Sequence, residues 1–362
     1  MAANTSIEWT DHSFNAWWGC TKVGPPCDHC YAEAWAKRTG FPNLWGVDAD
    51  RRTFSDKHWN EPLKWDRDAA ASGNRMRVFA NSMADVFDNH PTVDAERWRL
   101  WDLIDMTPNL DWLLLTKRVG NAIDMLPKRW LDARDGLPRN VWLGATVADQ
   151  KEATRDIPKL LSIPAAVRFL SCEPLLGPVD LRYLSYDSGD RLPEEMRVNS
   201  DQCSLDALRG VTTWPGSHYQ SPTIKRNTRF IDGEVFQSAG ESRHVDWVIC
   251  GGESGPNARP IHPNWVRSLR DQCINAGIAF HFKQWGEWAP HSPQAGGDLG
   301  GDVRRGQVRI VHPSGRSDIE ISEATGGLSS ERGSRYMAHV GKKQAGRLLD
   351  GRTWDEVPHV SQ

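Results

Sequence analysis

Short apolar runs bounded by turn residues recur along the chain. A continuous apolar run of this length is typical of a buried parallel strand, because other elements cover both faces of such a strand. The clearest runs are residues 77–80, 112–115, 141–144, 167–170, 247–250 and 279–282. A further strand near Phe14–Trp18 would bring the total to about seven.

Helical patterns lie between these runs. In residues 92–106 apolar side chains recur at helical spacing and form one stripe, and residues 119–133, 149–162 and 263–276 have similar patterns. The alternation of strand and helix predicts parallel βαβ units. With about seven strands, we predict an α/β fold of the TIM-like (β/α) barrel type, complete or partial, with insertions, rather than a doubly wound sheet.

Two segments interrupt the alternation. Residues 182–243 are rich in Ser, Asp, Arg and Gly, and we expect them to form an insertion or lid over the C-terminal ends of the strands. Residues 291–362 form a predicted C-terminal extension, with a hairpin from 308–311 that turns at 312–315 and a short helix after Lys342. The predicted barrel domain is therefore 1–290, followed by this extension.

Composition narrows the class of protein. The 362 residues are 39% hydrophobic and 25% charged, which is typical of a globular protein. No apolar run is long enough to span a bilayer and no secretory signal is evident, so we expect a cytoplasmic protein without membrane association. The net charge of −3 gives no global electrostatic argument for nucleic-acid binding.

Three of the seven cysteines lie within one short segment. Cys20, Cys27 and Cys30 have the spacing C-x6-C-x2-C, directly after the first predicted strand. Three thiolates suit a [4Fe–4S] cluster with one iron left open for a small ligand. A structural zinc ion would need a fourth protein ligand, for which His29, Cys172 or Cys250 are available. We favour the iron–sulfur cluster and keep zinc as the alternative.

Several longer motifs resemble the phage-associated three-Cys-motif protein family, a family similar to the radical SAM enzymes and distantly to spore photoproduct lyase. They are the cysteine loop with YAE at 31–33, VFANSMADVFD at 78–88, LLLTKR at 113–118, LGATVADQ at 143–150, FLSCEPLLGPVDL at 169–181, VICGGESGPNARP at 248–260, FKQWGEW at 282–288 and VGKKQAGRLLDGRTWDEVP at 340–358. The resemblance implies a [4Fe–4S] cluster in the loop after the first barrel strand. The spacing departs from the common C-x3-C-x2-C pattern, because six residues separate the first two cysteines.

Polar residues follow the predicted strands, where functional groups of parallel barrels gather. Ser82 and Asp85 suit the ammonium group of S-adenosylmethionine, although Asp85 can equally cap the next helix. Lys117 is a surface lysine or, by the resemblance to spore photoproduct lyase, a contact for the methionine carboxylate. Thr146 suits the ribose hydroxyls, although threonine is also common in strands for its β-propensity.

The fifth and sixth predicted strands end in a carboxylate and a glycine-rich turn. Glu173 ends an apolar strand, and a carboxylate in that position is usually paired or functional. In the next turn, Gly251 and Gly252 would let the backbone approach the cofactor while Glu253 makes a polar contact; the alternative is a simple strand-exit turn.

Taken together, these expectations predict a radical SAM enzyme. It would use the cluster to cleave S-adenosylmethionine to methionine and a 5′-deoxyadenosyl radical, which abstracts hydrogen from a substrate. The resemblance favours DNA or a modified nucleobase as that substrate, and the reaction needs an external electron donor. No catalytic residue is assigned. The alternative is a zinc-stabilised, non-catalytic nucleic-acid-binding phage accessory protein.

Overall fold

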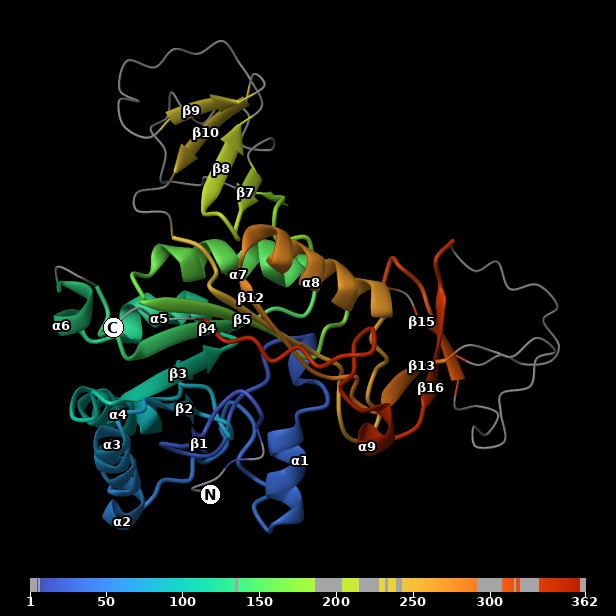
Figure 1. Cartoon of the computed structure of the whole chain (residues 1–362). Helices are drawn as coiled ribbons and strands as arrows, with labels where there is room; N and C mark the ends of the chain where they lie inside the picture. The colour runs from blue at the N-terminus through green and yellow to red at the C-terminus, as the bar shows by residue number, and fades with distance from the viewer. Residues whose placement is uncertain are drawn as a thin grey trace.

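The computed structural model describes residues 5, 7–133, 136–185, 204–214, 228–231, 234–238, 243–291, 308–315, 317–319 and 332–358. A parallel sheet with helices on its outer side forms the body of the molecule (Figure 1). Two smaller antiparallel sheets project from it. Among the described residues, no helix has the length and apolar character needed to cross a membrane.

The main sheet has seven strands in the order β1-β2-β3-β4-β5-β11-β12, and its pairs are parallel. The strands are β1 His12–Ser13, β2 Met76–Ala80, β3 Leu110–Thr116, β4 Val141–Thr146, β5 Val167–Cys172, β11 Trp247–Gly251 and β12 Ala279–Gln284. The sheet curls into a half-barrel. No pairing joins β1 to β12 in the described part of the chain, so the predicted α/β class is confirmed and a complete barrel is not formed there.

Six of the predicted strands are confirmed, and the first is wrong in position. It lies at His12–Ser13, before the predicted Phe14–Trp18. The chain leaves the sheet after Phe14 because side chains take over its hydrogen bonds. The Ala16 amide donates to Asn81 Oδ1 at 2.9 Å, and Asn15 Oδ1 accepts from the Met83 amide at 2.7 Å.

Side chains alternate between two buried layers, which explains the continuous apolar runs. One layer faces the helices and contains Val78, Trp112, Leu143, Leu170 and Val248. The other fills the concave side of the half-barrel with Phe79, Leu113, Trp142, Phe169 and Ile249, and Trp9 packs against it from the N-terminal segment. The inside of the half-barrel is therefore packed rather than open at this level.

The helices that cover the sheet are α3 Glu61–Ser72, α4 Asp94–Asp105, α5 Val119–Met125, α6 Lys128–Leu131, α7 Gln150–Ser162 and α8 Pro263–Ala276. The predictions for α4, α7 and α8 are confirmed to within two residues at each end. The predicted helix 119–133 is instead two helices, because the chain is extended at Leu126 and Pro127. Helices α1 Tyr31–Arg38, α2 Asp56–Trp59 and α3 were not predicted.

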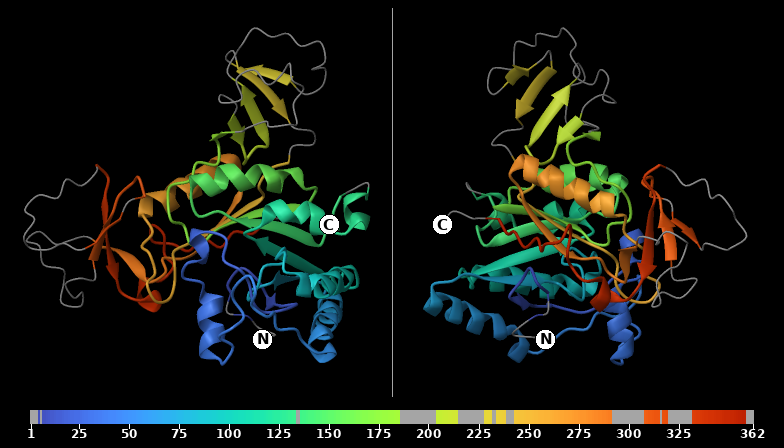
Figure 2. Two further views of the ribbon diagram at one scale, coloured as in Figure 1. Left: turned by 180° about the vertical axis from the view of Figure 1, so that it is seen from behind. Right: turned by 45° about the vertical axis from the view of Figure 1, so that its right-hand side comes forward.

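The first insertion contributes a five-stranded antiparallel sheet in the order β6-β7-β8-β10-β9. Its strands are β6 Leu184–Ser185, β7 Ser204–Asp206, β8 Val211–Trp214, β9 Thr228–Ile231 and β10 Glu234–Ser238. This sheet stands beyond α7 and α8 (Figure 2), and its described residues do not line the cavity at the strand ends. In this position the described residues form an insertion outside the cavity.

The path of the chain before the insertion explains this position. Gln150 on α7 exchanges hydrogen bonds with the Asp180 backbone, at 3.2 Å to its carbonyl and 2.7 Å from its amide. Gln272 on α8 likewise binds the Val179 carbonyl and the Leu181 amide. The two side chains bring the chain back onto the helical layer, so the insertion leaves from there.

The C-terminal extension forms the third sheet, with the order β13-β16-β14-β15. Its elements are β13 Trp288–His291, β14 Val308–Val311, β15 Ser317–Ile319, β16 Arg335–His339 and the short helix α9 Lys342–Ala345. The tail then covers the exposed edge of β12: the Phe282 amide donates to the Trp354 carbonyl and the Phe280 amide to Glu356. This edge is therefore not available for pairing with another strand.

Acid should destabilise the protein through His281 on β12. Its side chain is buried, and burial lowers its pKa from 6.5 to about 4. Between these values the unfolded chain binds a proton that the folded chain does not, so the stability present above pH 6.5 is lost as the pH falls. We expect a loss of about 2 kcal/mol between pH 7 and pH 5, measured by urea unfolding. His281→Phe should remove this part of the pH dependence; an unchanged dependence would contradict the assignment.

Candidate functional site

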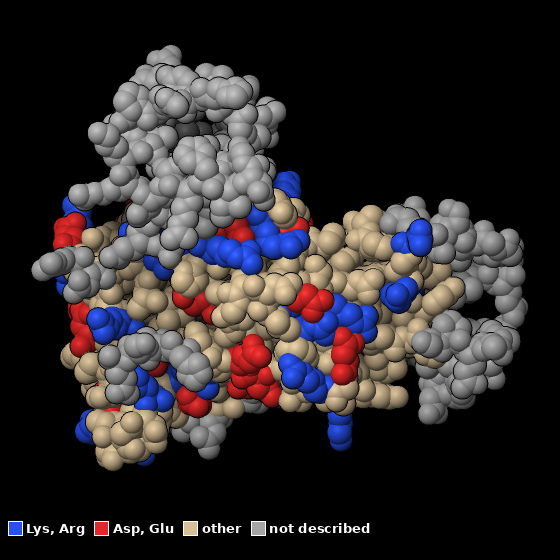
Figure 3. Space-filling view, turned by 45° about the horizontal axis from the view of Figure 1, so that its top comes forward, with Lys and Arg blue, Asp and Glu red and all other residues tan. Residues whose placement is uncertain are grey.

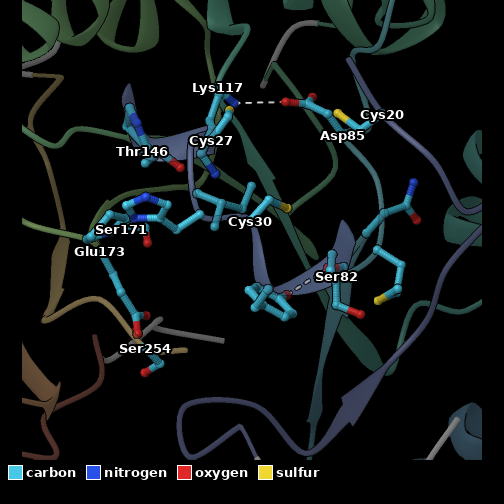
Figure 4. A pocket seen from close by; sticks show the side chains of 18 of the residues that line it. Cys20, Cys27, Cys30, Ser82, Asp85, Lys117, Thr146, Ser171, Glu173 and Ser254 are labelled. Carbon is cyan, nitrogen blue, oxygen red and sulfur yellow. Dashed lines mark hydrogen bonds between the residues drawn. The ribbon is translucent and has the colours of Figure 1, made fainter. Parts of the chain in front are cut away.

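A cavity of about 380 Å³ lies at the C-terminal ends of the parallel strands. Most of the residues predicted as a site line it together (Figure 4). They are Cys20, Cys27, Cys30, Ser82, Asp85, Lys117, Thr146, Glu173, Gly252 and Glu253. The topology thus brings together residues that the sequence separates widely, and the volume is in the range of small-ligand sites.

The backbone around Cys20 is held by the segment that follows α1. The Cys20 amide donates to the Leu44 carbonyl, and the Cys20 carbonyl accepts from the Gly46 amide. Gly19 has φ +109°, and a Cβ there would lie 2.5 Å from the Leu44 carbonyl oxygen, so only glycine is accommodated. The first cysteine is therefore positioned by backbone contacts.

A buried ion pair supports this side of the loop. Arg51 Nε lies 2.9 Å from Asp88 Oδ2, and the two side chains are 0% and 1% exposed. The Arg51 guanidinium also donates to Thr21 Oγ1 and to the carbonyls of Ala49 and Gly46. Sequence reasoning missed both residues, because nothing in the local pattern links positions 51 and 88.

A second ion pair holds the other end of the cysteine loop. Arg259 Nη2 lies 2.6 Å from Glu253 Oε1 and donates to the Pro25 carbonyl at 2.9 Å, while Nη1 lies 3.2 Å from Asp28 Oδ2. His29 Nδ1 lies 3.0 Å from Glu253 Oε2. Burial opposes the ionisation of Glu253, but hydrogen bonds from Arg259 and His29 outweigh it and lower its pKa. Glu253 therefore joins the β11 turn to the cysteine loop.

The Asp85 carboxylate binds residues at the end of β3 and does not cap a helix. Its carboxylate accepts from Thr116 Oγ1 at 2.6 Å, from the Lys117 amide at 2.9 Å and from the Phe87 amide at 3.0 Å. Arg118 Nη1 lies 3.2 Å from the same carboxylate. The predicted role of Asp85 as an ammonium contact is thus opposed by four donors that already occupy it.

Arg118 also reaches the first cysteine. Its Nη1 lies 3.4 Å from Cys20 Sγ, and its Nη2 donates to the Thr21 carbonyl. Burial and the Asp85 carboxylate raise the pKa of the Cys20 thiol to about 12, and Arg118 opposes this increase. Sequence reasoning assigned a role to Lys117 and none to its neighbour Arg118.

Glu173 is paired on the opposite wall. Lys283 Nζ lies 3.0 Å from Glu173 Oε2, and Gln284 Nε2 donates to Glu173 Oε1 at 3.0 Å. The two glycines of the β11 turn also lie close to other parts of the protein. A Cβ at Gly251 would lie 3.2 Å from Glu173 Cδ, and one at Gly252 would lie 2.0 Å from the Trp285 carbonyl oxygen. These glycines allow close packing within the protein, and Gly251 does not line the cavity.

Several polar groups of the cavity wall have no partner within the described part of the protein. The Lys117 ammonium makes no ion pair there, in contrast to Lys283. The buried atoms Asn81 Nδ2, Thr146 Oγ1 and Gln284 Oε1 make no hydrogen bond there. Buried polar atoms without partners cost free energy, so a polar ligand that supplied the missing hydrogen bonds would be stabilised here.

The residues proposed as further zinc ligands lie elsewhere or are occupied. Cys172 and Cys250 are buried in the layer that faces the helices, whereas His29 lines the cavity but binds Glu253. Among the described residues, no group of three or more His, Cys, Asp or Glu side chains is arranged to hold a single metal ion. Three cysteines line the cavity together with His29, Asp85, Glu173 and Glu253, whose side chains are paired within the protein. In a [4Fe–4S] cluster each thiolate binds a different iron, so three thiols are the donor set that such a cluster with one open iron takes.

Comparison with known proteins gives one match. No curated protein and no solved structure matches the chain significantly. A family model described as "Protein of unknown function (DUF5131)" matches residues 4–358, which is nearly the whole chain. The chain therefore belongs to the DUF5131 family of proteins of unknown function.

Proposed function

We propose that the protein is a radical SAM enzyme that binds a [4Fe–4S] cluster through Cys20, Cys27 and Cys30. The observation that carries the proposal is the position of these three thiols in one cavity with polar residues from six strand ends. When bound, the cluster would supply the electron that cleaves S-adenosylmethionine. An external donor would have to deliver that electron.

The chain's own residues would bind and orient the cofactor. The ammonium of Lys117 suits the methionine carboxylate, because it faces the cavity without a protein partner. Asn81 and Thr146 offer a hydrogen-bond donor and a hydroxyl for the adenine or ribose. Glu173, Glu253 and Asp85 would act through the structure around the cofactor, since each already binds basic side chains.

Replacement of Lys117 should weaken binding of S-adenosylmethionine. A lost charge-assisted hydrogen bond is worth about 1.5–3 kcal/mol, so Lys117→Gln should raise the Kd by roughly 10- to 100-fold. Equilibrium dialysis with the reconstituted protein measures this effect. Lys22→Gln is the control, because Lys22 also lines the cavity but is already paired with Glu33 at 2.9 Å. Equal effects of the two variants would contradict a specific role for Lys117.

For the substrate, we propose DNA or a modified nucleobase, with lyase, repair and modification reactions as the possible outcomes. The face shown in Figure 3 does not indicate a continuous basic surface, since its described Lys and Arg side chains are interspersed with Asp and Glu. Since the net charge of −3 gives no global attraction to DNA either, selection would depend on the cavity. Binding of a flipped-out base would meet this requirement.

The proposed function is tested by anaerobic reconstitution with iron and sulfide. The reduced protein is incubated with S-adenosylmethionine with and without a short DNA oligonucleotide, and 5′-deoxyadenosine is quantified. We expect a brown protein that forms this product. A colourless protein that holds one equivalent of zinc and excludes iron would overturn the proposal in favour of the zinc-stabilised binding protein.

A further inference from the structure

Arg118 contacts the sulfur of a proposed cluster ligand. Its Nη1 lies 3.4 Å from Cys20 Sγ, and the side chain is only 7% exposed. Within the described residues, neither Cys27 nor Cys30 has a side-chain donor to its sulfur. The three ligands are therefore not equivalent, and the charged donor acts on Cys20 alone.

The guanidinium is fixed from several directions before any ligand binds. Nη1 lies 3.2 Å from Asp85 Oδ2, Nη2 lies 3.6 Å from Asp88 Oδ1, and Asp88 is in turn paired with Arg51. The Arg118 amide donates to Thr116 Oγ1 at 2.8 Å, which fixes the backbone at the end of β3. A donor held in this way needs no rearrangement to reach a cluster sulfur.

Resting on the proposed function, we infer that Arg118 is a positioning residue that sets the reduction potential of the cluster through its hydrogen bond to Cys20. Reduction adds negative charge to the cluster and its thiolates. An N–H group of a guanidinium directed at a ligand sulfur stabilises that charge, so it makes reduction easier. The carboxylates of Asp85 and Asp88 balance the positive charge of the guanidinium. The effect of Arg118 on the reduction potential therefore comes from its directed hydrogen bond, which a more distant cation would not make.

The experiment is a redox titration of the reconstituted full-length protein, followed by electron paramagnetic resonance. In Arg118→Gln we expect iron content equal to the wild type and, at the wild-type midpoint, a ratio of reduced to oxidised cluster that is about tenfold lower. That corresponds to a midpoint about 59 mV more negative for a one-electron couple. Arg118→Lys should lie between the two, because it keeps the charge but replaces the planar guanidinium, whose separate nitrogens bind Cys20 and Thr21, by a single ammonium group.

The outcomes separate this inference from the proposed function. If Arg118→Gln binds the cluster with an unchanged midpoint, the inference is wrong and the function stands. If Arg118→Gln does not fold, Arg118→Lys is used for the test instead. A midpoint potential of Arg118→Lys equal to that of the wild type then rejects the inference. A wild-type protein that takes up no iron rejects the proposed function itself. Arg155→Gln, on the exposed side of α7, is the control and should leave the midpoint unchanged.

Discussion

Cys27→Ala is expected to lose its iron–sulfur cluster and with it all cleavage of S-adenosylmethionine. Cys27 follows the rigid Pro25-Pro26 pair in the short helical turn Pro25–Cys27, and its side chain lines the cavity. Two remaining thiolates would leave two irons without protein ligands, so the cluster would be labile. Iron and sulfide analysis after anaerobic gel filtration measures the loss, and 5′-deoxyadenosine should fall to the level of the protein-free control.

Cys273→Ala is the matched control for this prediction. Cys273 is also a buried free cysteine, but it lies on α8 among core residues. We expect this variant to retain wild-type iron content, with only the modest loss of stability that follows from a smaller core side chain. Retention of the cluster by Cys27→Ala, or equal loss of iron in both variants, would contradict the assignment of the ligands.

Asp88→Ala is expected to give the largest loss of stability. The variant leaves the fully buried Arg51 without its carboxylate and also removes a carboxylate near Arg118. Breaking a buried ion pair from one side costs about 3–5 kcal/mol, because the remaining charge has lost both water and its partner. Chemical unfolding followed by tryptophan fluorescence measures the change.

Asp94→Ala serves as the comparison for Asp88→Ala. Asp94 also pairs with an arginine, at 2.6 Å from Arg97, but its side chain is 61% exposed. Solvent screens such a pair, and its removal should cost less than about 1 kcal/mol. Similar free-energy changes in the two variants would show that burial does not strengthen the Arg51–Asp88 pair.

Contacts of Arg118 and Arg259 explain how the protein accommodates six residues between Cys20 and Cys27, where the common pattern has three. Arg118 binds the Thr21 carbonyl at the start of the segment between Cys20 and Cys27, and Arg259 binds the Pro25 carbonyl near its end. These arginines follow β3 and β11, which lie at different positions in the sheet. The six-residue spacing is therefore held from two sides, and the thiols stay at the same cavity.

Local pattern was sufficient to predict most regular elements. Helix α8 was predicted over its exact range from its apolar pattern, and the structure shows Pro263 in its first turn and Gly277, with φ +71°, at its end. The six longer strands were recognised because both of their faces are buried. Strand β1 was predicted in the wrong position because it has only two residues and stops where Asn81 takes over its hydrogen bonds. Helix α1 was not predicted, because only two of its eight residues, Ala32 and Ala36, are buried.

The sequence by itself determined the α/β class, the parallel strands and most of the predicted residues that meet in one cavity, because strand ends of a parallel sheet share an edge. Only the tertiary structure decided which of these residues are already paired. His29 and Glu253 are 224 positions apart, and no local periodicity can specify a contact over that separation. The same reason explains why Arg118 and Arg259 emerged as contacts of the cysteine loop only when the chain was folded.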